Sequence, residues 1–127
     1  MSKQPIGGPP MAGGMRIPLS RAMRAGDFVF CSGWMSLDEH GQIVGRTIEE
    51  QTRKVIEDLR DVLAEAGCTL QDVVKVMAWL ADPRDFGGFN RAYAEYFPTD
   101  PPARSAVGTM LIFDAKLELE MIAYKPQ

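Results

Sequence analysis

The sequence predicts an α+β domain in which a mixed β-sheet carries two helices on one face. Two segments have apolar residues at helical spacing, and five have the composition or alternation of strands, in the order β-β-α-β-α-β-β. At 127 residues the chain has room for one hydrophobic core and no second one. Right-handed crossovers between strands of one sheet then place both helices on the same face.

Two strands are expected before the first helix. Residues 19–24 alternate as an edge strand does, and residues 28–35 are rich in aromatic and β-branched side chains, so the two are expected to form a hairpin. Gly33 lies inside the second strand and marks a bulge or a close approach by another group. The only histidine, His40, falls in the next turn, where nothing would orient it for catalysis.

The first helix begins at Thr47, which with Glu50 forms a capping box. Apolar residues then recur at a period of 3.6 until Gly67, which is expected to end the helix in a left-handed conformation. Residues 73–80 follow as a strand that is apolar on both alternating faces. This strand is therefore expected to be central in the sheet and covered on both sides.

The second helix is predicted to begin at Asp82-Pro83, where a capping residue precedes a proline at the first helical position. Pro98 is expected to stop it. Its apolar face is aromatic, and at this spacing an aromatic stripe indicates packing in the core rather than a cofactor site. The residues of this face are Phe86, Phe89, Tyr93 and Phe97.

Arg104 is the main candidate for binding a ligand. It follows a rigid double proline and enters an apolar strand predicted over residues 106–112, where it is the only charge. A guanidinium in that setting needs an anion, and its forked donors suit a carboxylate. Two alternatives stay open from the residues alone, since Arg104 could extend into water or pair with a carboxylate of the same chain.

The last predicted strand, residues 116–124, has a clear period of two. Leucine, methionine and alanine side chains form one face, and Glu118, Glu120 and Ile122 form the other. Both glutamates could face water, or one of them could face Arg104. The sequence alone does not separate these two arrangements.

Composition narrows the class of protein. The net charge of −3 without long runs of one sign argues against a nucleic-acid footprint, and no apolar run approaches the ~20 residues that span a bilayer. Cys31 and Cys68 are expected to be free thiols in a reducing, cytoplasmic compartment, and a single histidine argues against a protein-only metal site. Residues 1–14, rich in glycine and proline, are expected to be a flexible leader ahead of a domain over residues 15–127.

The sheet has one face that no helix of this chain can cover. Residues 73–80 are apolar on both sides, and the sequence offers no third helix. We therefore expect the chain to associate with copies of itself through the uncovered face, as a homo-oligomer.

The chain resembles the YjgF/RidA/L-PSP family over nearly everything from Pro18 to Tyr124. Four segments in this order carry the resemblance: Phe28-Val29-Phe30-Cys31-Ser32-Gly33, Glu50-Gln51-Thr52-Arg53, Phe89 to Phe97, and Pro101-Pro102-Ala103-Arg104-Ser105 with Leu117 to Ala123 downstream. The resemblance implies a chorismate-mutase-like fold and a homotrimer with ligand sites in the clefts between subunits. It also implies a deaminase that hydrolyses reactive 2-imino and enamine acids to 2-oxo acids and ammonia without metal or organic cofactor.

Six positions match site residues of that family. By resemblance, Arg104 clamps the substrate carboxylate and Glu120 positions the attacking water. The other four matches line the cleft or lie beside the clamp. They are Ser32 and Gly33 on the second strand, Asn90 on the second helix, and Ser105 next to the arginine.

Three positions depart from the family pattern. Leu19 stands where many members have a tyrosine, Trp34 where a glutamine is usual, and Ala106 where a cysteine is common. The side-chain end of the pocket is therefore expected to be reshaped, with Leu19 and Trp34 in its wall. A larger enamine such as aminomuconate, or aminoacrylate, is an alternative substrate.

Two alternatives come from other classes. One is a ligand-binding or regulatory protein without catalysis, and the other is a member with the ribonuclease and translation-inhibitor activity attributed to some relatives. No basic-aromatic surface and no pair of histidines supports RNA cleavage here.

Overall fold

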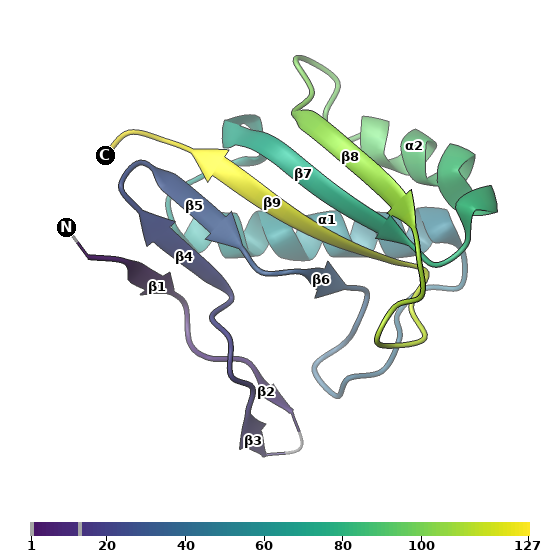
Figure 1. Ribbon diagram of the computed structural model, residues 1–127, viewed down its shortest axis with the longest axis horizontal. Coiled ribbons are helices and arrows are strands. Elements are labelled where there is room, and N and C mark those ends of the chain that lie inside the picture. The colour runs from purple at the N-terminus through teal and green to yellow at the C-terminus, as the bar shows by residue number, and fades with distance from the viewer. Residues whose placement is uncertain (1, 13) are drawn as a thin grey trace.

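A computed structural model describes residues 2–12 and 14–127 and contains one mixed sheet with two helices (Figure 1). The main sheet has the order β1-β4-β5-β9-β7-β8, with β6 beside β9. β7 and β8 run parallel, and the other neighbours in this sheet are antiparallel. Its strands are β1 (Gln4–Ile6), β4 (Ala22–Ala25), β5 (Phe28–Cys31), β6 (Trp34–Met35), β7 (Val73–Leu80), β8 (Ala103–Gly108) and β9 (Leu117–Tyr124).

The two helices, α1 (Ile48–Glu65) and α2 (Phe86–Ala94), pack against each other and against the same face of the sheet. A short antiparallel pair, β2 (Met11–Ala12) and β3 (Met15–Arg16), lies outside the main sheet. The α+β class and the mixed sheet with two helices are confirmed. No helix in the described ranges is both long and apolar enough to cross a membrane.

Helix α1 begins and ends as its sequence predicts. The Thr47 hydroxyl accepts a hydrogen bond from the Glu50 amide, and the Glu50 carboxylate accepts one from the Thr47 amide in return. The helix ends with Gly67 at a φ of +78°, a left-handed conformation that costs glycine little. The Arg24 guanidinium donates to the Ala66 carbonyl and so satisfies one of the free acceptors of this helix end.

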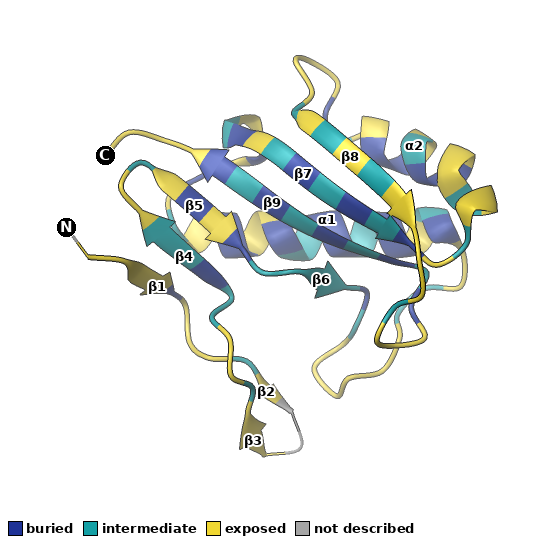
Figure 2. Ribbon diagram, in the orientation of Figure 1, coloured by how far each residue is buried: buried dark blue, intermediate teal, exposed yellow. Residues whose placement is uncertain are grey.

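The sheet buries one face completely and the other only in part. On β9, Leu117, Leu119, Met121 and Ala123 are fully or almost fully buried against the helices, whereas the alternate residues are half-buried. Figure 2 shows this alternation along β9 and β7. We call the side that carries the helices the helix face and the opposite side the open face.

Strand β7 is central, as predicted, because it lies between β9 and β8. Only its helix face is covered in the single chain, since Met77 and Trp79 on the open face are half-buried. Covering of the second face by a copy of the chain stays a prediction.

Three predicted boundaries are wrong. The strand predicted from Leu19 up to the turn at Gly26-Asp27 begins only at Ala22, and it is not an edge strand because β4 lies between β1 and β5. The strand predicted over 28–35 is broken at Ser32-Gly33 into β5 and β6. β8 begins at Ala103 and ends at Gly108, not at residues 106 and 112. Its end is set by the neighbouring strand, because the parallel pairing with β7 stops where β7 ends.

The second helix also differs in detail from its prediction. Asp82-Pro83 begins a short 3-10 turn over Pro83–Asp85, and α2 follows only from Phe86. The helix ends at Ala94, before Pro98, so Phe97 is buried but lies beyond the helix.

Part of the predicted leader is ordered against the sheet. Residues Gln4–Ile6 form β1, which pairs with β4, and Ile6 is buried. Nothing in a segment so rich in glycine and proline predicts a three-residue edge strand, because the sheet edge supplies the pairing. Met1 and Gly13 of the expected leader lie outside the described residues.

Candidate functional site

Arg104 lies on the helix face of β8, above the aromatic stripe of α2. Its guanidinium carbon is 4.8 Å from the ring centroid of Tyr93, 5.2 Å from that of Phe89 and 5.7 Å from that of Phe86. The side chain is half-buried and forms no ion pair within the described part of the chain. The aromatic faces stabilise the cation without neutralising it, so its donors stay available to an anion from outside the chain.

The three aromatic rings form a platform because of their spacing on α2. Positions three and four apart face the same side of a helix, and successive centroids are 6.5 Å apart for Phe86 and Phe89 and 5.4 Å for Phe89 and Tyr93. Phe89 and Tyr93 are buried, whereas Phe86 is 44% exposed. Burial raises the pKa of Tyr93 to about 12, although the charge of Arg104 acts in the opposite direction. Its phenol is therefore neutral at physiological pH.

A hollow of about 230 Å³ lies beside Arg104, where the end of β8 meets the start of α2. Ala106 lines it and lies two residues after Arg104 on the same face of the strand, and Phe86 lines it and contacts the guanidinium. A ligand held by Arg104 could therefore extend into this hollow.

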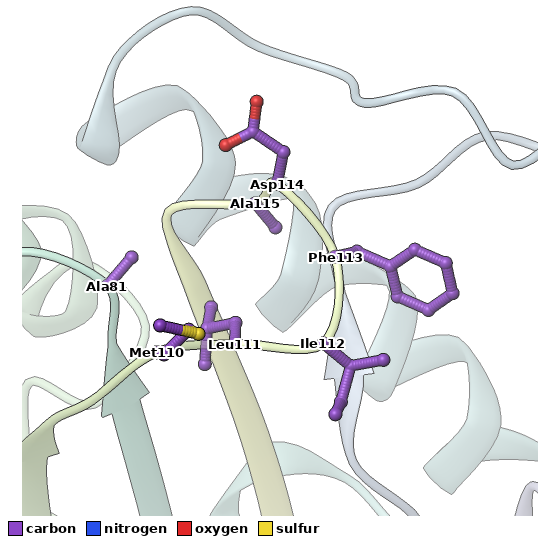
Figure 3. Close-up of a pocket in the computed structure, with 7 residues that line it drawn as sticks. All are labelled: Ala81, Met110, Leu111, Ile112, Phe113, Asp114 and Ala115. Atoms are coloured by element: carbon purple, nitrogen blue, oxygen red, sulfur yellow. The ribbon is translucent and has the colours of Figure 1, made fainter.

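A larger hollow of about 510 Å³ lies elsewhere, between Ala81 and the loop over residues 110–115 (Figure 3). Its only charged lining residue is Asp114, and none of the site residues predicted from the sequence lines it. The hollow beside Arg104 is the better candidate, because Phe86 in its wall also lies against the Arg104 guanidinium.

The structure places Arg104 and Glu120 on opposite faces of the sheet. Val76 pairs with Arg104 on one side and Met121 on the other, whereas the next residue, Met77, pairs with Ser105 and Glu120. Neighbouring rows of a sheet point to opposite faces, so Ser105 and Glu120 share the open face and Arg104 does not. Within one chain, neither Glu120 nor Glu118 faces Arg104.

Gly33 lies close to the carboxylate of Glu118 on β9. A Cβ at Gly33 would overlap Oε2 of Glu118, so the group that comes close at this position is a side chain rather than another backbone or a ligand. Burial raises the pKa of Glu118, and the negative charge of Glu120 on the same face raises it further.

Gly33→Ala is expected to destabilise the fold by about 1–3 kcal/mol, because the new methyl group would have to displace the Glu118 carboxylate. Urea unfolding measures this loss. Gly8→Ala is the matched control, since no atom lies within 4 Å of its added Cβ. The double variant Gly33→Ala/Glu118→Ala should recover most of the loss, and an unchanged loss in the double variant would contradict the proposed overlap.

Glu118→Gln is expected to be more stable than the wild type at pH 8. The folded state binds the Glu118 proton more tightly than the unfolded state does, so ionisation of this carboxyl opposes folding at high pH. The advantage of the variant should fade as the pH falls and vanish below the ordinary pKa of 4.5, where the carboxyl is protonated in both states. Thermal unfolding over this pH range tests it, with Glu39→Gln in an exposed turn as control. A pH-independent difference would argue against a buried titrating carboxyl.

Three of the remaining predicted site residues, Ser32, Trp34 and Leu19, lie in or before the strands β5 and β6. The Ser32 hydroxyl donates to the Ser20 carbonyl, which ties the break between β5 and β6 to the segment before β4. Trp34 is on the helix face, where its indole N–H donates to Asp58 at 3.2 Å and Arg21 lies over its ring. Leu19 is exposed in the preceding loop.

Asn90 is half-buried on α2, the helix that carries the platform, and Ser105 is exposed on the open face of β8. One chain therefore does not gather the predicted residues into one cavity. The aromatic platform was predicted as core alone. The sequence pattern that could have predicted a functional role for it is an aromatic stripe on α2 followed by a single arginine, Arg104, at the start of the next strand. No cluster of three or more His, Cys, Asp or Glu side chains that could hold a metal occurs in residues 2–12 and 14–127.

The sequence matches a known protein family over most of its length. Residues 14–125 match the family described as Endoribonuclease L-PSP. A RutC family protein of Pyrococcus abyssi is 46% identical over 110 residues, which cover 85% of this chain and 87% of that protein. The chloroplastic Reactive Intermediate Deaminase A of Arabidopsis thaliana is 39% identical over 108 residues, 84% of this chain and 58% of the relative.

The fold matches solved structures over almost its whole length. The crystal structure of yeast Mmf1 superposes with a TM-score of 0.88 at 35% sequence identity and covers 98% of this chain and 99% of its own. The sequence match and the structural match extend over the same domain, from the strands before α1 to the end of β9. The chain therefore belongs to the YjgF/RidA/L-PSP family.

Proposed function

We propose that the protein is a cofactor-independent deaminase that hydrolyses 2-imino and enamine acids to 2-oxo acids and ammonia. The observation that carries the proposal is the Arg104 guanidinium, which is half-buried over three aromatic rings, has no acid partner in the described chain and adjoins a hollow. A relative named Reactive Intermediate Deaminase A supports the reaction class.

The chemistry needs little more than orientation. Arg104 would hold the substrate carboxylate through two charge-assisted hydrogen bonds. A water oxygen then bonds to the imine carbon while its proton passes to a carboxylate and the imine nitrogen gains a proton. Collapse of this carbinolamine breaks the C–N bond, releases ammonia and forms the 2-oxo acid. Holding the electrophilic carbon and the water together supplies much of the rate enhancement.

Glu120 is the proposed carboxylate, and a second copy of the chain would have to bring it to Arg104. Within one chain the two side chains occupy opposite faces of the sheet. The open face that carries Glu120 also exposes an aromatic group, with Phe28 and Tyr124 in contact at a centroid distance of 5.1 Å and Phe30 beside them. We propose a homotrimer, for which light scattering should give three times the chain mass of 14.1 kDa.

Glu120→Gln is expected to lower kcat for imine hydrolysis about 10²–10⁴-fold, the usual contribution of a positioned acid-base group, with little change in KM. The test supplies freshly generated 2-imino acids from an amino-acid oxidase and measures the imine that semicarbazide still traps. Glu118→Gln, two residues away on the same face, is the comparison that shows which carboxylate acts. Equal turnover by wild type and Glu120→Gln would exclude this role.

Two other functions give different results in the same preparations. A preference for aminomuconate or aminoacrylate over simple 2-imino acids would indicate the larger or enamine substrate. RNA cleavage that survives further purification and imine hydrolysis that is absent would favour the ribonuclease named by the family description. The imidazole of the single histidine, His40, lies 3.5 Å from Glu39 in an exposed turn, with no second histidine to form a pair for RNA cleavage.

A further inference from the structure

The side chains that line the hollow beside Arg104 are all apolar. Its lining residues carry no charged side chain and no side-chain hydrogen-bonding group. They come from the end of β7, the turn before α2, the first residue of α2 and the end of β8. They are Leu80, Pro83, Phe86, Ala106, Val107 and Gly108.

One close contact shapes this hollow. A Cβ at Gly108 would lie 2.7 Å from Cγ of Pro83, so the absence of a side chain lets the strand end approach the proline ring. The nearest charges along the chain are Asp82 and Arg84, on either side of Pro83, and Asp85, next to Phe86. Asp82 and Arg84 form an ion pair at 2.8 Å. Neither is free to neutralise a charge inside the hollow.

Two residues link the cation to the hollow. Ala106 lines the hollow and lies two residues after Arg104 on the same face of β8, about 6.6 Å along the strand between Cα atoms. Phe86 also lines the hollow, and the guanidinium carbon of Arg104 lies 5.7 Å from the centroid of its ring. A carboxylate on the guanidinium would place the substituent at its α-carbon against Ala106 and Phe86.

We infer that this hollow is the side-chain subsite and that it selects 2-imino acids with apolar side chains of about four carbons over acidic ones. The inference rests on the proposed function for the identity of the anion at Arg104. Each buried methylene is worth about 0.8 kcal/mol, or about fourfold in affinity. A carboxylate placed among the same walls would lose its hydration and gain no partner.

The small side chain of Ala106 sets the capacity of the subsite. Leucine at this position would add three carbon atoms to the space that the ligand uses, and valine would add two. The expected effect is therefore graded and specific to long side chains, whereas a ligand with only a methyl group should be affected little.

The test measures Kd by calorimetry for pyruvate, 4-methyl-2-oxopentanoate and 2-oxoglutarate, which are stable products of the proposed reaction. We expect wild type to bind 4-methyl-2-oxopentanoate tens of times more tightly than pyruvate, and 2-oxoglutarate no more tightly than pyruvate. Ala106→Val and then Ala106→Leu should weaken 4-methyl-2-oxopentanoate progressively, by at least tenfold for leucine, and leave pyruvate within twofold. Ala94→Leu, at an exposed position of α2, is the matched control and should change neither affinity.

The outcomes separate the subsite from the reaction. Equal or tighter binding of 2-oxoglutarate, or an equal loss of all ligands in both Ala106 variants while they remain folded by circular dichroism, would overturn the subsite. Imine hydrolysis with no dependence on side-chain length would also overturn it while leaving the proposed function intact. The expected binding preference without any imine hydrolysis would support the subsite and reject the deaminase.

Discussion

Arg104→Ala is expected to lower kcat/KM for 2-imino acid hydrolysis by about 10²–10⁴-fold. Two charge-assisted hydrogen bonds to the substrate carboxylate are each worth about 1.5–3 kcal/mol, and every 1.4 kcal/mol is a factor of ten. Arg104→Lys keeps the positive charge but cannot make the two parallel hydrogen bonds of a guanidinium to a carboxylate. Its kcat/KM should therefore lie between those of the wild type and the alanine variant. The oxidase-coupled assay measures all three proteins.

Arg91→Ala is the control for this experiment. Arg91 lies in the last turn of α2, where it is exposed and paired with Glu49 at 3.0 Å on the surface. Its removal should leave kcat/KM within about twofold, because surface ion pairs contribute little. Full activity of Arg104→Ala in protein of unchanged mass would refute the carboxylate clamp.

Phe89→Ala is expected to reduce the free energy of unfolding by about 3–5 kcal/mol, the largest effect on stability that we expect from a single site. Its ring is fully buried and packs against Phe86 and Tyr93. A loss of this size is a large part of the 5–15 kcal/mol that holds an ordinary domain folded. Urea unfolding measures it, and the same variant should also loosen Arg104, which lies 5.2 Å above this ring.

Phe86→Ala makes the same chemical change one turn earlier and serves as the comparison. Phe86 is 44% exposed, so we expect a loss of only about 1 kcal/mol or less. A loss at Phe89 as small as the loss at Phe86 would mean that α2 does not close the core as the structure has it.

Local signals predicted most of the fold. The capping box at Thr47, the left-handed Gly67 and the period of two in β9 depend on residues close together in the chain, and all three are present. The limits of β8 depend on a neighbour instead, because its parallel partner β7 decides where hydrogen bonding stops. The edge strand β1 depends on β4 in the same way.

The sequence does not predict the face of the sheet on which each candidate site residue lies. The spacing within β9 places Glu118 and Glu120 together, yet it says nothing about the face on which Arg104 lies. That face is fixed by the register of β8 against β7 and of β7 against β9, which no pattern within one strand contains. The pairing of β6 with β9, Trp34 opposite Leu119, likewise places Trp34 against Asp58 rather than near Glu120.

The separation of Arg104 and Glu120 by the thickness of the sheet makes assembly part of the chemistry. Under the proposed function, a chain that has just folded holds the clamp and the proton acceptor out of reach of each other. Specific activity would then rise with protein concentration as encounters between chains become frequent, and a freshly synthesised molecule would stay idle until it met its neighbours.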